Sequence, residues 1–250
     1  MNLKDELKTL YLKTSKHSNY QILTEEIARI LDIDDKDIHS RYERERFEYI
    51  KRNISLFQKN ILDIGGNTGY FTFESLKNGC STVDYYEGNK EHALFVEKAK
   101  HLFDKGENIN VVPEYYLFKD NEKRYDIVYC LNVIHHLGAD FLNTGNIEDA
   151  KEEMIRCINQ LSYVTEYLVL QIGFNWCGKK DSGLFNMGTK KEMEQFIQSE
   201  TKDKWNILNI GIAEKNNNGI CYNNMTVENN NRNDELGEFL NRPVFIMQAK

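Results

Sequence analysis

Short apolar runs alternate with helix-like patterns along most of this chain. The runs are rich in β-branched and aromatic side chains, which predicts buried strands, and between them apolar residues recur every three or four positions, as on one face of a helix. The predicted strands are 61–64, 81–86, 108–113, 124–131, 166–173, 205–212 and 242–248. The predicted helices between them are 70–77, 90–103, 146–162 and 189–199. This alternation predicts an α/β fold with helices on both faces of a mostly parallel sheet.

Residues 1–56 show helical periodicity without the alternation typical of a strand. Apolar residues recur at helical spacing at Leu3, Leu7, Leu10, Tyr11, Ile22, Ile27, Ile30 and Leu31. A further helix is expected from an acidic start at Asp34 and Asp35 to about Leu56. Its alternating charges predict a solvated face of ion pairs; the alternative is a lid that lends an arginine or Tyr42 to a carboxylate ligand. We therefore expect a helical cap or lid over residues 1–56 and one α/β domain over residues 57–250.

Two segments carry no regular pattern. Residues 174–188 mix aromatic residues with glycines after a predicted strand, so we expect them to wall a pocket. Residues 214–235 are rich in asparagine and predict a long flap or a hairpin, because loops of this length are uncommon unless they are functional or disordered.

Composition narrows the possible partners. The formal net charge of −7 and the pI near 5.5 argue against a sequence-independent grip on a phosphate backbone, so a nucleic-acid partner is not expected. Apolar runs stay well short of the roughly 20 residues that span a bilayer, and the charged N-terminus does not resemble a secretion signal. Five scattered cysteines are typical of reduced thiols. These features predict a cytoplasmic protein, and they carry no signal for an oligomeric state.

A glycine-rich turn follows the first predicted strand. Gly65, Gly66, Asn67 and Gly69 separate that strand from the helix that begins at Tyr70. In an α/β sheet such a junction lies at the carboxyl edge of a strand, where backbone N–H groups and a helix N-terminus bind small charged ligands. We therefore expect the cofactor site here.

Glu87 ends the next predicted strand, 24 residues after Asp63. That interval corresponds to one strand–helix–strand unit, which would place a carboxylate where it can accept hydrogen bonds from both hydroxyls of a ribose. A single glutamate at a strand end is usually a solvated surface group. Its spacing from the glycine turn favours the ribose-binding role for Glu87, with Gly88 beside it.

The run DIGGNTG from Asp63 to Gly69 resembles motif I of the class I S-adenosylmethionine-dependent methyltransferases, Asp/Glu-x-Gly-x-Gly-x-Gly. Asn67 stands where that motif usually has its middle glycine, and asparagine adopts left-handed backbone conformations more readily than most residues. A dinucleotide-dependent dehydrogenase would need Gly-x-Gly-x-x-Gly and a substrate domain, which are not evident. The resemblance covers residues 57–250, including the strand-four run 125–137 and the final strands.

The resemblance implies a Rossmann-like, seven-stranded sheet with an antiparallel last strand, and S-adenosylmethionine as the cofactor. The implied cofactor-binding residues are Asp63, Gly65, Gly66, Asn67, Gly69, Glu87, Gly88 and Asn132. Asp63 would orient the ammonium group, the glycines would admit the aminoacyl part, and Asn132 would lie near the methionyl end.

His135 and His136 follow strand four, where the transferred methyl group is expected to point. Methyl transfer from a sulfonium mainly requires alignment of donor and acceptor, but a hydroxyl acceptor also benefits from a general base. Both histidines are candidates for that base, with His136 favoured because similar methyltransferases often keep a histidine there; the alternative is a packing or helix-start role. The spacing of Glu87, Asp126 and the two histidines does not indicate a metal site, so we expect none.

The function expected from these features is O-methylation of a small polar metabolite such as a sugar, a nucleotide-sugar or a surface-polysaccharide precursor. The run from Leu240 to Phe245 also resembles the C-terminal ends of methyltransferases from bacterial surface-carbohydrate pathways. One alternative is an N-methyltransferase or a methyl- or alkyltransferase of a tRNA base. The other is a non-catalytic protein that binds the cofactor or scaffolds a partner.

Overall fold

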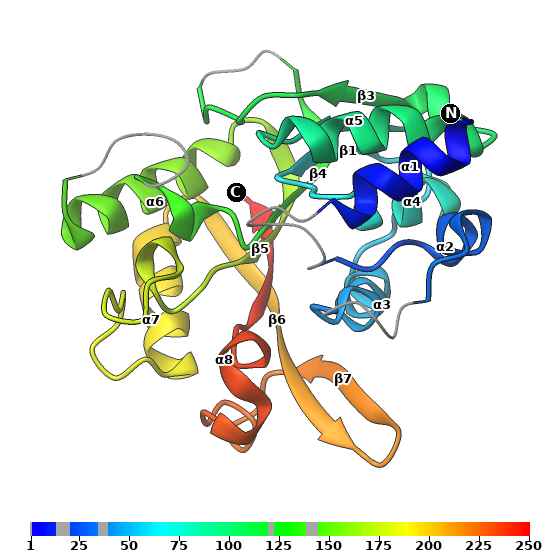
Figure 1. Cartoon of the computed structure of the whole chain (residues 1–250). Helices are drawn as coiled ribbons and strands as arrows, with labels where there is room; N and C mark the ends of the chain where they lie inside the picture. The colour runs from blue at the N-terminus through cyan, green and yellow to red at the C-terminus, as the bar shows by residue number, and fades with distance from the viewer. Residues whose placement is uncertain (1, 14–20, 35–39, 120–122, 139–144) are drawn as a thin grey trace. The chain divides into compact units, whose positions relative to one another are not determined.

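The computed structural model describes residues 2–13, 21–34, 40–119, 123–138 and 145–250 (Figure 1). The chain forms two compact units. The first comprises Met1–Phe47 and Ser55–Tyr116, and the second comprises Glu48–Ile54 and Leu117–Lys250. Each unit has strands and helices of its own.

The first unit contains three parallel strands in the order β3-β2-β1. Its strands are β1 (Asn60–Ile64), β2 (Thr82–Tyr86) and β3 (Ile109–Val112). Its helices are α1 (Leu3–Leu12), α2 (Glu25–Leu31), α4 (Tyr70–Lys77), α5 (Lys90–Ala99) and the first turn of α3 (Glu43–Asn53). Ile61, Leu62, Val83 and Tyr85 are fully buried, as expected for strands covered on both faces.

Helix α1 lies against α5 in this unit (Figure 1). Tyr11 of α1 packs its ring 5.8 Å from that of Phe95, measured between centroids. An ion pair of 3.0 Å between Glu6 and Lys98 joins the same two helices at their surface. Two of the predicted N-terminal helices therefore form, and α1 packs onto α5.

The second unit contains five strands in the order β4-β5-β8-β6-β7. Its strands are β4 (Tyr125–Leu131), β5 (Thr165–Gln171), β6 (Trp205–Asn216), β7 (Gly219–Asn224) and β8 (Val244–Ala249). Its helices are α6 (Ile147–Leu161), α7 (Lys190–Thr201) and the short α8 (Gly237–Leu240). Strands β4 and β5 are parallel, whereas β8 runs antiparallel to both β5 and β6.

The asparagine-rich segment 214–235 begins with a hairpin, as predicted. Strand β6 pairs antiparallel with β7 from Gly211 to Asn216. Strand β6 therefore ends four residues beyond its predicted end at Ile212. The resemblance implied seven strands, and β7 is an eighth strand that was not predicted. The described strands therefore number eight, and the predicted α/β class with antiparallel last strands is confirmed.

Helix α3 is shorter than predicted. Part of the expected acidic start, Asp35, lies outside the described residues, and the described helix begins at Glu43 because Tyr42 has a left-handed backbone with φ of 57°. The Glu43 carboxylate accepts hydrogen bonds from the Arg41 N–H at 3.0 Å and the Ser40 hydroxyl at 3.0 Å, which fixes the chain just before the helix. Glu48 and Lys51 form an ion pair of 2.7 Å within the helix at the i,i+3 spacing that the charge pattern predicted. Arg44 forms an exposed pair of 3.7 Å with Glu25 of α2.

Glu43 and Arg46 depart from that pattern, because their side chains are only 1% and 4% exposed. Burial raises the pKa of Glu43, and the neighbouring Arg46 opposes that rise. The Arg46 guanidinium also lies 5.1 Å from the ring centroid of Phe71. One face of this charged helix is thus buried, which alternating charges alone did not predict. The lid role of this segment, and the division into a cap of 1–56 and a domain of 57–250, stay predictions.

Candidate functional site

The predicted cofactor loop lies in the first unit, between β1 and α4. Three of its residues have left-handed backbones: φ is 66° at Gly65, 54° at Asn67 and 84° at Gly69. A Cβ atom added to Gly69 would lie 2.9 Å from Phe73 and Val96, so that position also lacks room for a side chain. Asn67 therefore adopts the conformation for which the missing glycine was expected.

Backbone hydrogen bonds attach this loop to the end of β2. The Gly65 N–H donates to the Tyr86 carbonyl at 2.8 Å, and the Gly69 N–H donates back to the Gly66 carbonyl at 2.9 Å. The Asn67 N–H donates to Glu87 Oε2 at 2.8 Å. The conformation of the glycine turn is thus set by the adjacent strand.

Glu87 is oriented through both of its carboxylate oxygens. Oε2 accepts from Asn67, while Oε1 accepts from the Asn89 N–H at 2.7 Å. Two backbone donors thus fix the direction of the carboxylate just after β2. This geometry suits the predicted ribose contact.

Gly88 is crowded by an aromatic ring. A Cβ atom there would lie 2.3–2.6 Å from ring carbons of Tyr115, which is 45% exposed. The ring therefore lies directly over the backbone that follows Glu87. Tyr115 belongs to the apolar stretch after β3, and an exposed ring at this place can flank a planar base.

Asp63 is buried at the end of β1, where it is 3% exposed. Its Oδ2 accepts a hydrogen bond of 2.6 Å from the Thr72 hydroxyl of α4. Burial raises the pKa of Asp63 to about 7; the Thr72 hydrogen bond opposes the rise, and the charge of Glu87 adds to it. A Cβ atom on Gly66 would lie 2.5 Å from the Tyr85 ring and 2.7 Å from Asp63 Oδ2, so only glycine fits.

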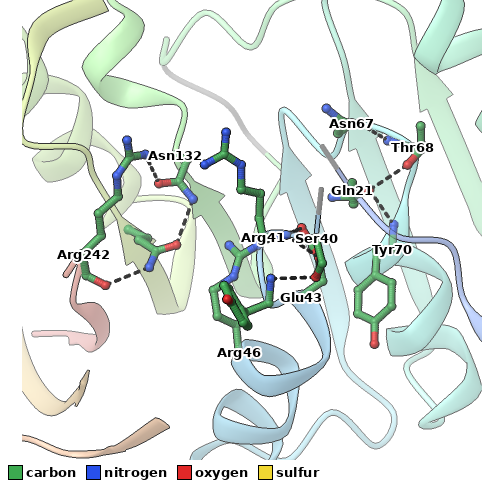
Figure 2. A network of polar contacts seen from close by, with 12 residues as sticks. Gln21, Ser40, Arg41, Glu43, Arg46, Asn67, Thr68, Tyr70, Asn132 and Arg242 are labelled. Atoms are coloured by element: carbon green, nitrogen blue, oxygen red, sulfur yellow. Dashed lines mark hydrogen bonds and ion pairs between the residues drawn. The ribbon is translucent and has the colours of Figure 1, made fainter. Parts of the chain in front are cut away.

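Asn132 lies in the second unit, directly after β4, in a closed ring of hydrogen bonds (Figure 2). Its Nδ2 donates to Gln171 Oε1 at 2.8 Å, and Gln171 Nε2 donates to the Arg242 carbonyl at 2.9 Å. Arg242 closes the ring by donating from one terminal nitrogen to Asn132 Oδ1 at 2.8 Å. Asn132 itself has a left-handed backbone, with φ of 63°, and the ring holds it there.

Arg242 is neutralised by a second partner. Its Nε and its other terminal nitrogen donate to the two carboxylate oxygens of Glu238 at 3.0 and 2.6 Å. No role was predicted from the sequence for Gln171, Glu238 or Arg242. Two features of the sequence could have indicated these contacts: a glutamine at the end of a predicted strand, and the i,i+4 spacing of Glu238 and Arg242.

The two histidines occupy a short 3-10 turn, Ile134–His136, in the same unit. His135 is 1% exposed and, among the described residues, its Nδ1 has no hydrogen-bond partner. Burial lowers the pKa of His135 well below its usual range, and the charges of Arg242 and His136 lower it further. A Cβ atom on Gly173 would lie 2.7 Å from its Nε2. His135 is therefore a tightly packed, neutral side chain, whereas His136 is partly exposed.

Residues 174–188 pack against this turn. The Trp176 indole N–H donates to the Leu137 carbonyl at 2.5 Å. A Cβ atom on Gly178 would lie 3.7 Å from Cε1 of His136. The segment that was expected to wall a pocket thus lies beside His136.

The structure brings the predicted residues together in two groups. Asp63, the glycine turn, Glu87 and Gly88 are neighbours in the first unit, and Asn132, His135 and His136 are neighbours in the second. Within the described ranges, no three His, Cys, Asp or Glu side chains are grouped to hold a metal ion. No helix in the described part of the chain is long and apolar enough to cross a membrane.

Comparisons with known proteins identify relatives in sequence. No family model matches the chain. Proteins named tRNA U34 carboxymethyltransferase from Campylobacter jejuni, among them that of strain 81-176, are 26% identical over 201 residues, covering 68% of this chain. The match covers 66% of those relatives, so the chain spans just under two thirds of their length.

Solved structures show similarity in fold. The bifunctional kinase-methyltransferase WbdD matches with a TM-score of 0.58 and 13% identity, over 97% of this chain and 46% of that chain. Magnesium protoporphyrin IX methyltransferase (ChlM) from Synechocystis PCC 6803, solved with bound SAM, matches with a TM-score of 0.54 and 12% identity over 100% of this chain and 98% of that chain. These matches confirm the predicted class I methyltransferase fold. The predicted enzyme class agrees with the names of these relatives and neighbours, and ChlM was solved with the predicted cofactor.

Asp63→Asn should remove a pH-dependent loss of stability. Between pH 4 and 7 the unfolded chain has released the Asp63 proton while the folded chain retains it, so the protonated native carboxyl stabilises the fold at low pH and this contribution is lost as pH rises to about 7. The free energy of unfolding of the variant, relative to that of wild type, should therefore rise by roughly 2–4 kcal/mol between pH 4 and pH 8. Urea unfolding of both proteins across this range measures the difference. A difference that does not change with pH would contradict the buried, protonated Asp63.

Proposed function

We propose that this chain, which has the class I S-adenosylmethionine-dependent methyltransferase fold, binds S-adenosylmethionine and transfers its methyl group to an acceptor. The observation that carries the proposal is the glycine turn 65–69, attached through the Asn67 N–H to the Glu87 carboxylate that follows β2. Gly66 supports the fit, because a side chain there would collide with Tyr85 and Asp63. The relatives and the neighbours in fold carry names from the same group of enzymes.

In this proposal, three residues of the first unit hold the cofactor. Glu87 accepts the ribose hydroxyls, the exposed ring of Tyr115 flanks the base, and Asp63 accepts from the ammonium group. A positive charge beside Asp63 would favour its ionised form, so binding would release a proton below about pH 7. The bound cofactor supplies a methyl group on a sulfonium that is already activated for displacement.

The acceptor in this proposal is a hydroxyl of a small polar metabolite such as a sugar, a nucleotide-sugar or a surface-polysaccharide precursor. His136 is the proposed base, because His135 is buried and held neutral by its surroundings whereas His136 is partly exposed. Asn132, fixed by Gln171 and Arg242, is the proposed contact to the methionyl end. An acidic chain of this kind would act in the cytoplasm on a soluble acceptor.

A second candidate is transfer to a base of tRNA. It is favoured by the sequence relatives, which are named for tRNA U34 and for a carboxymethyl group. A third possibility, a protein that binds the cofactor without catalysis, would share the first-unit site. Turnover in the presence of an acceptor separates the catalytic proposals from this one.

Glu87→Gln should weaken binding of S-adenosylmethionine by about 10- to 100-fold, because an amide supplies one acceptor atom where the ribose needs two. Isothermal titration calorimetry measures the effect. Glu114→Gln is the matched control, since it makes the same change at an exposed glutamate after β3 and should bind like wild type. If wild type failed to bind the cofactor, the proposed function would fall.

His136→Gln should lower kcat by about 10²- to 10⁴-fold on a hydroxyl acceptor and leave the cofactor Kd nearly unchanged. The acceptor is first identified by incubating sugars, nucleotide-sugars and unmodified tRNA with methyl-labelled S-adenosylmethionine. His101→Gln, at an exposed histidine of the first unit, is the control. Retention of full kcat by His136→Gln would exclude a base role and favour a nitrogen acceptor.

The salt dependence of acceptor binding distinguishes the two catalytic candidates. A tRNA acceptor should bind with an affinity that falls about 10³- to 10⁵-fold between 50 and 200 mM salt, whereas an uncharged sugar should show almost no change. Mass spectrometry of the product then shows whether the acceptor has gained the mass of one methyl group. If tRNA became labelled and its binding weakened steeply with salt, the small-metabolite proposal would be overturned, while the proposed methyl transfer would stand.

A further inference from the structure

Helix α4 begins without a cap of its own. Its N-cap residue is Gly69, which has no side chain to accept from the first N–H groups of the helix. Buried donors that lack an acceptor destabilise a helix end, so the Tyr70 N–H needs a partner from elsewhere. That partner is Gln21, which lies 49 residues earlier in the chain.

Gln21 accepts two hydrogen bonds through one oxygen (Figure 2). Its Oε1 accepts from the Tyr70 N–H at 3.0 Å and from the Thr68 hydroxyl at 3.1 Å. Gln21 is 8% exposed and Thr68 is 4% exposed, so water is largely excluded from both groups. Loss of this acceptor would leave two donors buried between the glycine turn and α4.

Gln21 is itself held by helix α1. The hydroxyl of Tyr11 donates to the Gln21 carbonyl at 2.9 Å, and this bond is buried. The neighbouring Ile22 and Leu23 are 5% and 2% exposed, so the backbone at Gln21 is fixed by packing. The side chain therefore meets the loop from a rigid support.

The contacts continue from Thr68 to the ribose-binding carboxylate. The Thr68 N–H donates to Asn67 Oδ1 at 2.8 Å, and the Asn67 N–H donates to Glu87 Oε2 at 2.8 Å. Tyr11, Gln21, Thr68, Asn67 and Glu87 thus form one connected series from α1 to the end of β2. Every residue of this series belongs to the first unit.

We infer that Gln21 is a positioning residue for the cofactor loop, through which the N-terminal helices set the affinity for the cofactor. The inference rests on the proposed function, since it names a further determinant of the same site. Gln21 acts by fixing Thr68 and Tyr70, which keeps Asn67 and Glu87 in place. By linkage, ligand bound at the loop stabilises residues 21–34 in return.

The test compares Gln21→Met, which keeps the length of the side chain and removes the acceptor, with Gln21→Glu, which keeps an acceptor oxygen. The probe is S-adenosylhomocysteine, whose Kd is measured by calorimetry on the full chain. Gln21→Met should weaken binding about tenfold, and Gln21→Glu should stay within about threefold of wild type. Equal affinity of Gln21→Met and wild type would overturn the inference.

Ile27→Val is the matched control, because it loosens the same N-terminal segment at a fully buried position on α2 and leaves Gln21 intact. It should bind the probe like wild type, and a loss equal to that of Gln21→Met would show a general effect of stability instead. Tyr11→Phe removes only the bond that holds the Gln21 carbonyl and should weaken binding about threefold. If Gln21→Met does not fold, Tyr11→Phe tests the inference in its place. Unchanged binding of the probe by Tyr11→Phe would then overturn the inference.

Hydrogen exchange separates this inference from the proposed function. The Tyr70 amide should exchange faster in Gln21→Met than in wild type without any ligand present, because its acceptor has been removed. If wild type did not bind S-adenosylhomocysteine, the proposed function would fail while faster exchange would still support the Gln21 contact. Unchanged exchange of this amide would overturn the contact whatever the protein binds.

Discussion

The hydrogen bond from the Asn67 N–H to the Glu87 carboxylate is the contact on which the candidate cofactor site depends. A turn with three left-handed residues in five positions is unfavourable by itself, and Asn67 carries a side chain there. Glu87 compensates by accepting from Asn67 with one oxygen and from Asn89 with the other. The same two bonds hold the carboxylate at the end of β2. One interaction therefore stabilises the turn and orients the acid that the proposed function requires.

Burial around this contact changes the chemistry of the neighbouring acid. Asp63 lies beneath the turn, and its ionisation is opposed by low solvent access and by the charge of Glu87. The hydrogen bond from Thr72 offsets only part of this effect. An anion that is costly in the free protein is a favourable partner for a cation, because the ion pair restores the lost solvation. A cation close to Asp63 would therefore lower its pKa again.

The elements of the fold were predictable because their signals are local. Periodicity located most helices and strands, and the glycines located the turn, within a few residues of their observed bounds, whereas α3 begins nine residues after its predicted start and β7 was not among the predicted strands. The positions of Asp63 in β1 and of Glu87 directly after β2 were also predicted, because one strand–helix–strand unit fixes their spacing. Gln21 and Arg242 were not, because their partners lie 49 and 110 residues away and no local pattern indicates such contacts. The buried faces of Glu43 and Arg46 were missed for the same reason, since charge alternation predicts pairing and does not predict depth.

Burial and the charge of Arg242 both disfavour protonation of His135. Glu238 binds two of the guanidinium nitrogens, and Asn132 binds the third, so the arginine is fixed in place without carrying a large unbalanced charge. The hydrogen-bonded ring at the end of β4 therefore places a fixed cation beside the buried His135, while the neighbouring His136 is partly exposed.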